Sequence, residues 1–281
     1  MAAFGLDFRN AKSKWLYREA AAPSFWWAIA MAVALFLVHA LVFQSLTTLM
    51  AYKLVFGGSF STAFELVSGK PSSEITKSAI IGLAPAAIMT SVVALFMAKF
   101  LGGGRSIGLP LHYPSLGFAG WVATLVLFVV AMYLTFLLVF LVFQVDPQSY
   151  SPAGGLENAG ENAGMVERTM AELGKNWLMY ALALPGVMVF VPIAEELIFR
   201  GVLFNALLHS PVGKFGAVVI TAGLFALVHR LSPAPWLFVG VIFVMGLILG
   251  SLLLRFGSLW VPIACHVVWN TLSSLMIGLQ S

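Results

Sequence analysis

Long apolar stretches separated by shorter polar connections form the main pattern of this sequence. A helix needs about 20 mostly apolar residues to cross the hydrocarbon core of a membrane. Seven stretches meet that length, and they are 25–49, 78–98, 117–143, 178–206, 214–232, 236–254 and 259–278. The pattern predicts an all-α fold, a polytopic transmembrane helical bundle of about seven spans.

The polar connections divide the chain into four parts. Residues 1–24 mix basic and aromatic side chains, which predicts a basic amphipathic segment at the membrane surface or a frayed basic tail. Residues 25–143 hold the three N-terminal transmembrane spans. Residues 144–177 form a polar loop rich in Gly, Asn and Ala, with a short surface helix expected near 163–174. Residues 178–281 hold the last four spans and form the candidate catalytic transmembrane domain.

Composition excludes several classes of protein. Hydrophobic residues make up 60% of the chain and charged residues 9%, whereas soluble domains carry roughly 25% charged residues. An ordinary water-soluble enzyme and a disordered chain are therefore excluded. One cysteine, Cys265, excludes a disulfide framework. The net charge of +4 is too small, and the basic residues are too scattered, for a nucleic-acid surface. We therefore expect no nucleic-acid partner, and we expect the lipid bilayer to be the partner.

Ionisable side chains inside a span cost several kcal/mol unless they are paired, so each one is a functional candidate. The fourth span contains Glu195, Glu196 and Arg200. Glu196 and Arg200 lie four residues apart on one helix face, which predicts an intrahelical ion pair. Glu195 points about 100° away from this pair, and its carboxylate is left for chemistry.

The later spans supply two further pairs at the same spacing. Phe225 and His229 share a face of the fifth span, and His266 and Asn270 share a face of the seventh. Counting about 1.5 Å per residue from the connecting loops places Glu195 and these polar residues at similar depths. We expect Glu195, His229, His266 and Asn270 to converge on one intramembrane cavity.

A carboxylate, two imidazoles and a carboxamide are suited to hydrolysis. Glu195 could take a proton from water with the help of His229. His266 and Asn270 could then donate hydrogen bonds to the developing oxyanion, and no cofactor is required in this version. In the alternative version Glu195, His229 and His266 bind a divalent metal such as zinc, which activates the water.

Three motifs occur in order on late spans: Glu-Glu-x-x-x-Arg from Glu195, Phe-x-x-x-His from Phe225, and His-x-x-x-Asn from His266. Over roughly residues 178–275 the chain resembles the CAAX protease and bacteriocin-processing family of intramembrane endopeptidases, the type II CAAX prenyl endopeptidases. The resemblance implies that Glu195 and His229 activate water and that His266 and Asn270 hold the oxyanion. The supporting residues would be Glu196, Arg200 and Phe225.

The same resemblance implies that the substrate is a membrane-embedded protein or peptide, prenylated or otherwise lipidated. It also implies that this chain is a multi-pass protein of a prokaryotic cell membrane.

Other intramembrane protease classes lack support, because the only aspartates are Asp7 and Asp146, outside the spans, and no His-Glu-x-x-His occurs. The alternative to an enzyme is a non-catalytic immunity factor, scaffold or transporter that uses the same polar cluster for binding. A transporter would be expected to show repeat symmetry, which the first three spans do not supply.

Overall fold

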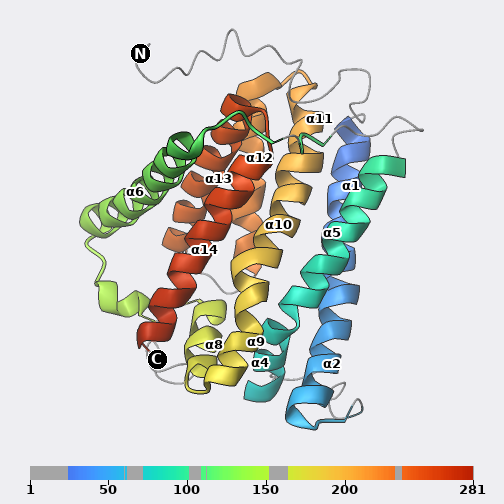
Figure 1. Ribbon diagram of the computed structural model, residues 1–281, viewed down its shortest axis with the longest axis vertical. Helices are drawn as coiled ribbons and strands as arrows, with labels where there is room; N and C mark the ends of the chain where they lie inside the picture. The colour runs from blue at the N-terminus through green and yellow to red at the C-terminus, as the bar shows by residue number, and fades with distance from the viewer. Residues whose placement is uncertain are drawn as a thin grey trace.

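The structure is a computed structural model. It describes residues 25–59, 61, 72–100, 109–111, 113–151, 164–231 and 236–280. Within these ranges every regular element is helical (Figure 1), which confirms the predicted all-α fold. The expected basic segment 1–24 lies outside the described residues.

The N-terminal part consists of one continuous helical span and one bent pair of helices. The first span comprises α1 (Phe25–Leu37), the π-helix η3 (Val38–Phe43) and α2 (Gln44–Phe56). The predicted second span, 78–98, is in fact a pair of helices bent by 41°, α4 (Ser73–Ile81) and α5 (Leu83–Phe100). The hydroxyl of Ser72 accepts a hydrogen bond from the Ile75 amide and so fixes where α4 begins.

The third span and the polar loop after it lead into the second half. Helix α6 (Phe118–Phe143) is followed by the short 3-10 helix η4 (Pro147–Tyr150) and by α8 (Met165–Gly174). The surface helix expected near 163–174 is therefore present as α8. Its apolar face packs with Ile80 and Ala183, residues of α4 and of the following helix. This small core lies at the end of the bundle where α4, α8 and α9 meet, as Figure 1 shows.

The fourth span changes helix type along its length. In order it contains α9 (Trp177–Pro185), the π-helix η5 (Gly186–Phe190), α10 (Val191–Glu196), the π-helix η6 (Leu197–Leu203) and α11 (Phe204–Leu208). Proline has no N–H, so Pro192 leaves the carbonyl of Met188 without its usual donor and crowds it. The helix widens in this region, and such π-turns are frequent at functional sites.

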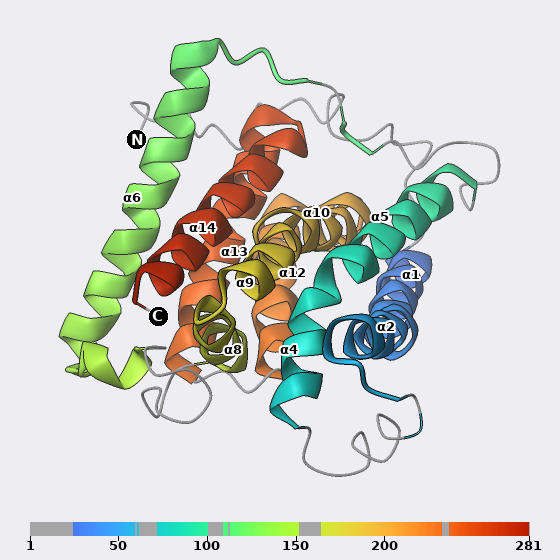
Figure 2. The ribbon, with the colours of Figure 1, turned by 60° about the horizontal axis from the view of Figure 1, so that its bottom comes forward.

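Three long helices complete the bundle: α12 (Gly213–Leu231), α13 (Trp236–Phe256) and α14 (Trp260–Gln280). Seen from the end of the bundle, α10 lies near the centre with α14 on one side and α5 on the other (Figure 2). In α13, 50% of the most apolar 18-residue stretch is buried inside the protein, whereas in α6 the buried share is 11%. Helix α13 therefore belongs to the interior of the bundle and α6 to its periphery.

Six helices of the described chain are long and apolar enough to cross a membrane, and the bent pair α4 and α5 would make a seventh. The seven predicted spans therefore all have counterparts in the structure. The four spans of the second half bring the polar motifs together at the centre of the bundle.

Candidate active site

A fully buried ion pair lies at the core of the site. Arg200 Nη1 lies 2.9 Å from Glu196 Oε1, and neither side chain is exposed, which confirms the predicted intrahelical pair. Arg200 also donates from Nη2 to the carbonyl oxygen of Gly246 on α13, over 3.3 Å. Its guanidinium lies 4.5 Å from the centre of the Phe225 ring. A carboxylate, a carbonyl and an aromatic face together compensate the buried positive charge.

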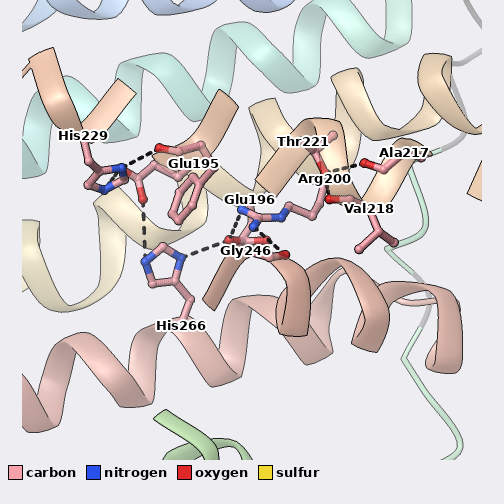
Figure 3. Close-up of polar contacts among 10 residues, drawn as sticks. Glu195, Glu196, Arg200, Ala217, Val218, Thr221, His229, Gly246 and His266 are labelled. Carbon is pink, nitrogen blue, oxygen red and sulfur yellow. Dashed lines mark hydrogen bonds and ion pairs between the residues drawn. The ribbon is translucent and has the colours of Figure 1, made fainter. Parts of the chain in front are cut away.

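His266 connects this ion pair to the second glutamate. Its Nδ1 atom lies 3.0 Å from Glu196 Oε1, and its Nε2 atom lies 3.6 Å from Glu195 Oε2 (Figure 3). The side chain is 2% exposed, so the ring is enclosed by protein on nearly every side. One imidazole from α14 therefore contacts both neighbouring carboxylates of α10.

His229 approaches Glu195 from α12. Its Nδ1 atom lies 2.8 Å from the carbonyl oxygen of Phe225, one turn earlier in the same helix. A carbonyl can only accept a hydrogen bond, so Nδ1 carries the hydrogen and Nε2 of the neutral ring carries the lone pair. That Nε2 atom lies 3.8 Å from Glu195 Oε1. The side chains of His229 and Glu195 are 29% and 23% exposed, so a small molecule can reach this part of the site while Glu196 stays sealed.

Phe225 is the aromatic residue around which the site packs. Its ring is fully buried and meets the rings of His229, Phe199 and His266 edge to face, with centroid distances of 4.7, 5.2 and 5.8 Å. The Phe-x-x-x-His spacing therefore places the aromatic ring against both imidazoles. Together with its contact to Arg200, this gives Phe225 a supporting position in the site.

Asn270 has a different neighbour from the other candidate residues. Its Nδ2 atom donates to the carbonyl oxygen of Val187 on η5, over 3.0 Å. Among the polar contacts of the described residues, Asn270 is joined to this segment rather than to Glu195. The bond holds α14 against the turn that leads into α10. It uses one of the two amide hydrogens, and the second is left for another acceptor.

Two contacts were not expected from the sequence. Burial raises the pKa of Glu167 on α8, a residue that lies near enough to His229 to respond to its charge. Spacing gave no signal for this residue, because it lies in a polar loop far from the motifs. His39 lies with Nδ1 2.8 Å from the Thr90 hydroxyl and so links η3 to α5.

The three residues expected as alternative metal ligands lie near one another, with Glu195 3.8 Å from His229 and 3.6 Å from His266. In the part of the chain that the structure describes, however, no group of three or more His, Cys, Asp or Glu side chains is arranged to hold a metal ion.

Comparison with known proteins matches the region that carries these residues. Residues 176–272 match the family model described as Type II CAAX prenyl endopeptidase Rce1-like, which confirms the resemblance over about a third of the chain. A protein of Bacillus subtilis (strain 168) named "Putative membrane peptidase YdiL" is 34% identical over 85 residues, 30% of this chain. The matched region covers 33% of the length of that relative. No solved structure is significantly similar to the chain. With its apolar helices, the chain is an integral multi-pass membrane protein, as predicted.

Proposed function

We propose that this protein is an intramembrane endopeptidase in which Glu195 and His229 activate water to hydrolyse a peptide bond. The observation that carries the proposal is that Glu195 Oε1 and the bare Nε2 atom of His229 face each other at 3.8 Å. Both atoms accept hydrogen bonds, and the distance is too long for a direct bond between them. A water molecule with two O–H donors satisfies both acceptors at once.

The reaction follows from this placement. Glu195 takes one proton from the water while the water oxygen bonds to the carbonyl carbon of the substrate. The carbonyl oxygen becomes an oxyanion, and the donors that we propose for it are His266 and the second amide hydrogen of Asn270. When the carbon–nitrogen bond breaks, the proton held by Glu195 passes to the leaving amine. The products are one carboxylic acid and one amine, and Glu195 is restored.

The substrate class that we propose is a membrane-associated protein or peptide, prenylated or otherwise lipidated. The site lies within a bundle of membrane-crossing helices, so the scissile bond must come to the bilayer. The name of the matching family model includes prenyl endopeptidase, and the name of the bacterial relative includes membrane peptidase. Both names support peptide-bond hydrolysis at a membrane.

We further propose that this hydrolysis requires no metal. The carboxylate of Glu195 and the imidazole of His229 are groups that can carry out this proton transfer themselves. The alternative is a zinc-type metalloendopeptidase with Glu195, His229 and His266 as ligands. Measuring bound metal in the purified protein and assaying it after chelation separates the two versions.

The proposal is tested with purified protein in detergent and a panel of lipidated and transmembrane peptides. We expect wild-type protein to cleave at least one peptide, and Glu195→Ala and His229→Ala to reduce the rate by at least about 100-fold, as loss of a general base does. Glu172→Gln is the matched control, because this carboxylate lies on α8 and pairs with lysines outside the site.

Cleavage that is unaffected by Glu195→Ala would exclude this mechanism. A folded wild-type protein that cleaves no peptide of the panel, and binds the same peptides equally well with or without Glu195, would favour the non-catalytic alternative of an immunity factor or scaffold.

A further inference from the structure

The π-helix η5, just before α10, has a wider hydrogen-bond register than an α-helix. The amide of Val191 donates to the carbonyl oxygen of Gly186, five residues back, where an α-helix would use four. The next donor in this register is the amide of residue 192, and its acceptor would be the carbonyl of Val187. Residue 192 is a proline and has no N–H. The Val187 carbonyl is therefore left without the donor that the π register assigns to it.

The side chain of Asn270 takes the place of this missing donor. Its Nδ2 atom lies 3.0 Å from the Val187 carbonyl oxygen. Inside a membrane no water is at hand to satisfy a carbonyl, so a side-chain donor at this point is needed. A carbonyl oxygen only accepts hydrogen bonds, so the contact also orients the amide group, with its NH₂ toward η5 and Oδ1 on the other side.

This contact lies next to the acidic part of the site. Asn270 follows His266 by one turn of α14, and the imidazole of His266 contacts both Glu195 and Glu196 of α10. The fourth span and α14 run in opposite directions, so the earlier segment η5 faces the later residue Asn270. The backbone of the fourth span therefore holds the amide one helical turn from the imidazole.

Helix α5 holds η5 from the other side (Figure 2). A Cβ atom on Gly186 would lie 2.8 Å from the backbone nitrogen of Ala84 and 3.1 Å from the Cβ atom of Leu83, both on α5. The buried Gly186 thus lets η5 lie directly against the start of α5. Because α5 blocks movement of η5 away from α14, the Val187 carbonyl is presented to Asn270 at a fixed position.

We propose that Pro192 is a positioning residue for Asn270, because the N–H that Pro192 lacks keeps the Val187 carbonyl available to the Asn270 amide. The use of the oriented amide rests on the proposed function, in which Asn270 donates its second hydrogen to the oxyanion. The contact itself is a property of the resting protein. A donor that is oriented before the reaction begins needs no reorganisation when the negative charge develops.

The first test needs no substrate. Protein labelled with ¹³C-valine and ¹⁵N-asparagine is placed in lipid nanodiscs, and solid-state NMR records the transfer between the Asn270 side-chain nitrogen and the Val187 carbonyl carbon. The signal is assigned by its loss in Val187→Ile. We expect it in wild-type protein, and we expect Pro192→Ala to lose it, because the new amide at position 192 then donates to the Val187 carbonyl.

Pro185→Ala is the matched control, because it adds an N–H at another, exposed proline of the same span. This variant should keep the signal. A signal that is absent from wild-type protein, or that is unchanged in Pro192→Ala, overturns the proposal. Pro192→Val supplies the same N–H with a side chain of similar size, and it replaces Pro192→Ala in each measurement if that variant does not fold.

Kinetics separate positioning from a purely structural role. Pro192→Ala is expected to lower kcat by about tenfold or more with KM changed less, and Pro185→Ala should keep the wild-type kcat. In an Asn270→Ala background, Pro192→Ala should have no further effect, because both changes act through one contact. An equal loss of kcat with and without Asn270 contradicts the proposal. If wild-type protein cleaves no peptide but the NMR signal depends on Pro192, the positioning role stands and the proposed function fails.

Discussion

Arg200 on η6 reaches across the bundle to the backbone of Gly246 on α13 and donates to its carbonyl oxygen over 3.3 Å. This contact depends on Gly246 having no side chain. A Cβ atom at this position would lie 2.8 Å from the Cα atom of Ala222, so α12 and α13 could not approach as closely. Gly246 is therefore a point of close packing between α12 and α13, and this packing also brings an acceptor to the buried arginine.

Gly246→Ala is therefore expected to destabilise the protein by about 1–3 kcal/mol, the usual cost of inserting a methyl group into a packed core. Gly240→Ala is the matched control, because a Cβ atom at Gly240 in the same helix meets nothing within 4 Å. Thermal unfolding of both variants in one detergent measures the effect. Equal melting temperatures for the two variants would show that the Gly246 contact is not required.

Removing Arg200 is expected to be more costly than removing the whole ion pair. Arg200→Met leaves Glu196 as a buried unpaired charge, which costs about 3–5 kcal/mol, whereas the double variant Arg200→Met with Glu196→Leu should recover most of that loss. Denaturant unfolding of the single and double variants gives the coupling energy. If the double variant loses as much unfolding free energy as the two single variants lose together, the result would argue against a buried pair.

Asn270→Ala is expected to lower kcat by about 100- to 1,000-fold with little change in KM, the effect of losing one oxyanion donor. The control is Tyr180→Phe, which removes a different hydrogen bond to α14, from the Tyr180 hydroxyl on α9 to the Ser274 carbonyl. That control should lose only about 1 kcal/mol of stability and keep its kcat. If both variants lose stability alike and neither loses kcat, then Asn270 is a structural residue.

Glu172 is expected to stabilise the protein above acidic pH. Its hydrogen bond to Lys175, at 2.8 Å, lowers the pKa of Glu172, with a further contribution from Lys77. A lowered pKa means stability that is present above the unfolded value of 4.5 and is lost as the pH falls through the folded value. The pair is partly exposed, so the effect should stay below about 1 kcal/mol. Glu172→Gln should melt lower than wild type at neutral pH, and the two curves should meet in acid.

Glu167, on the same helix, should show the opposite sign. Burial raises its pKa, and this outweighs the favourable contributions of its own backbone amide and of His229. The stability that a raised pKa supplies is present below the unfolded value of 4.5 and is lost as the pH rises through the folded value. Glu167→Gln should therefore gain stability relative to wild type as the pH is raised toward neutrality. A variant that loses stability on the same pH series would contradict this assignment.

The sequence by itself determined the fold class, the spans and the local pairs. Apolar length predicted the membrane-crossing helices, and spacing within one helix predicted the pairing of Glu196 with Arg200 and of Phe225 with His229. These features depend on the period of a single helix, which a sequence records directly. The same reasoning predicted that Glu195, His229, His266 and Asn270 would converge, and in the structure His229 and His266 lie 3.8 and 3.6 Å from Glu195 while Asn270 bonds to Val187.

Only the tertiary structure decided how these side chains face one another. The Gly246 carbonyl beside Arg200 does not follow from spacing, and neither does the Val187 carbonyl beside Asn270. The π-helices η5 and η6 on both sides of α10 contain more residues per turn than an α-helix. Counting at 3.6 residues per turn therefore does not predict in which direction a side chain beyond them points. The Nδ1 atom of His266 is likewise placed by Glu196 on another helix, at a distance that exists only once the bundle has packed.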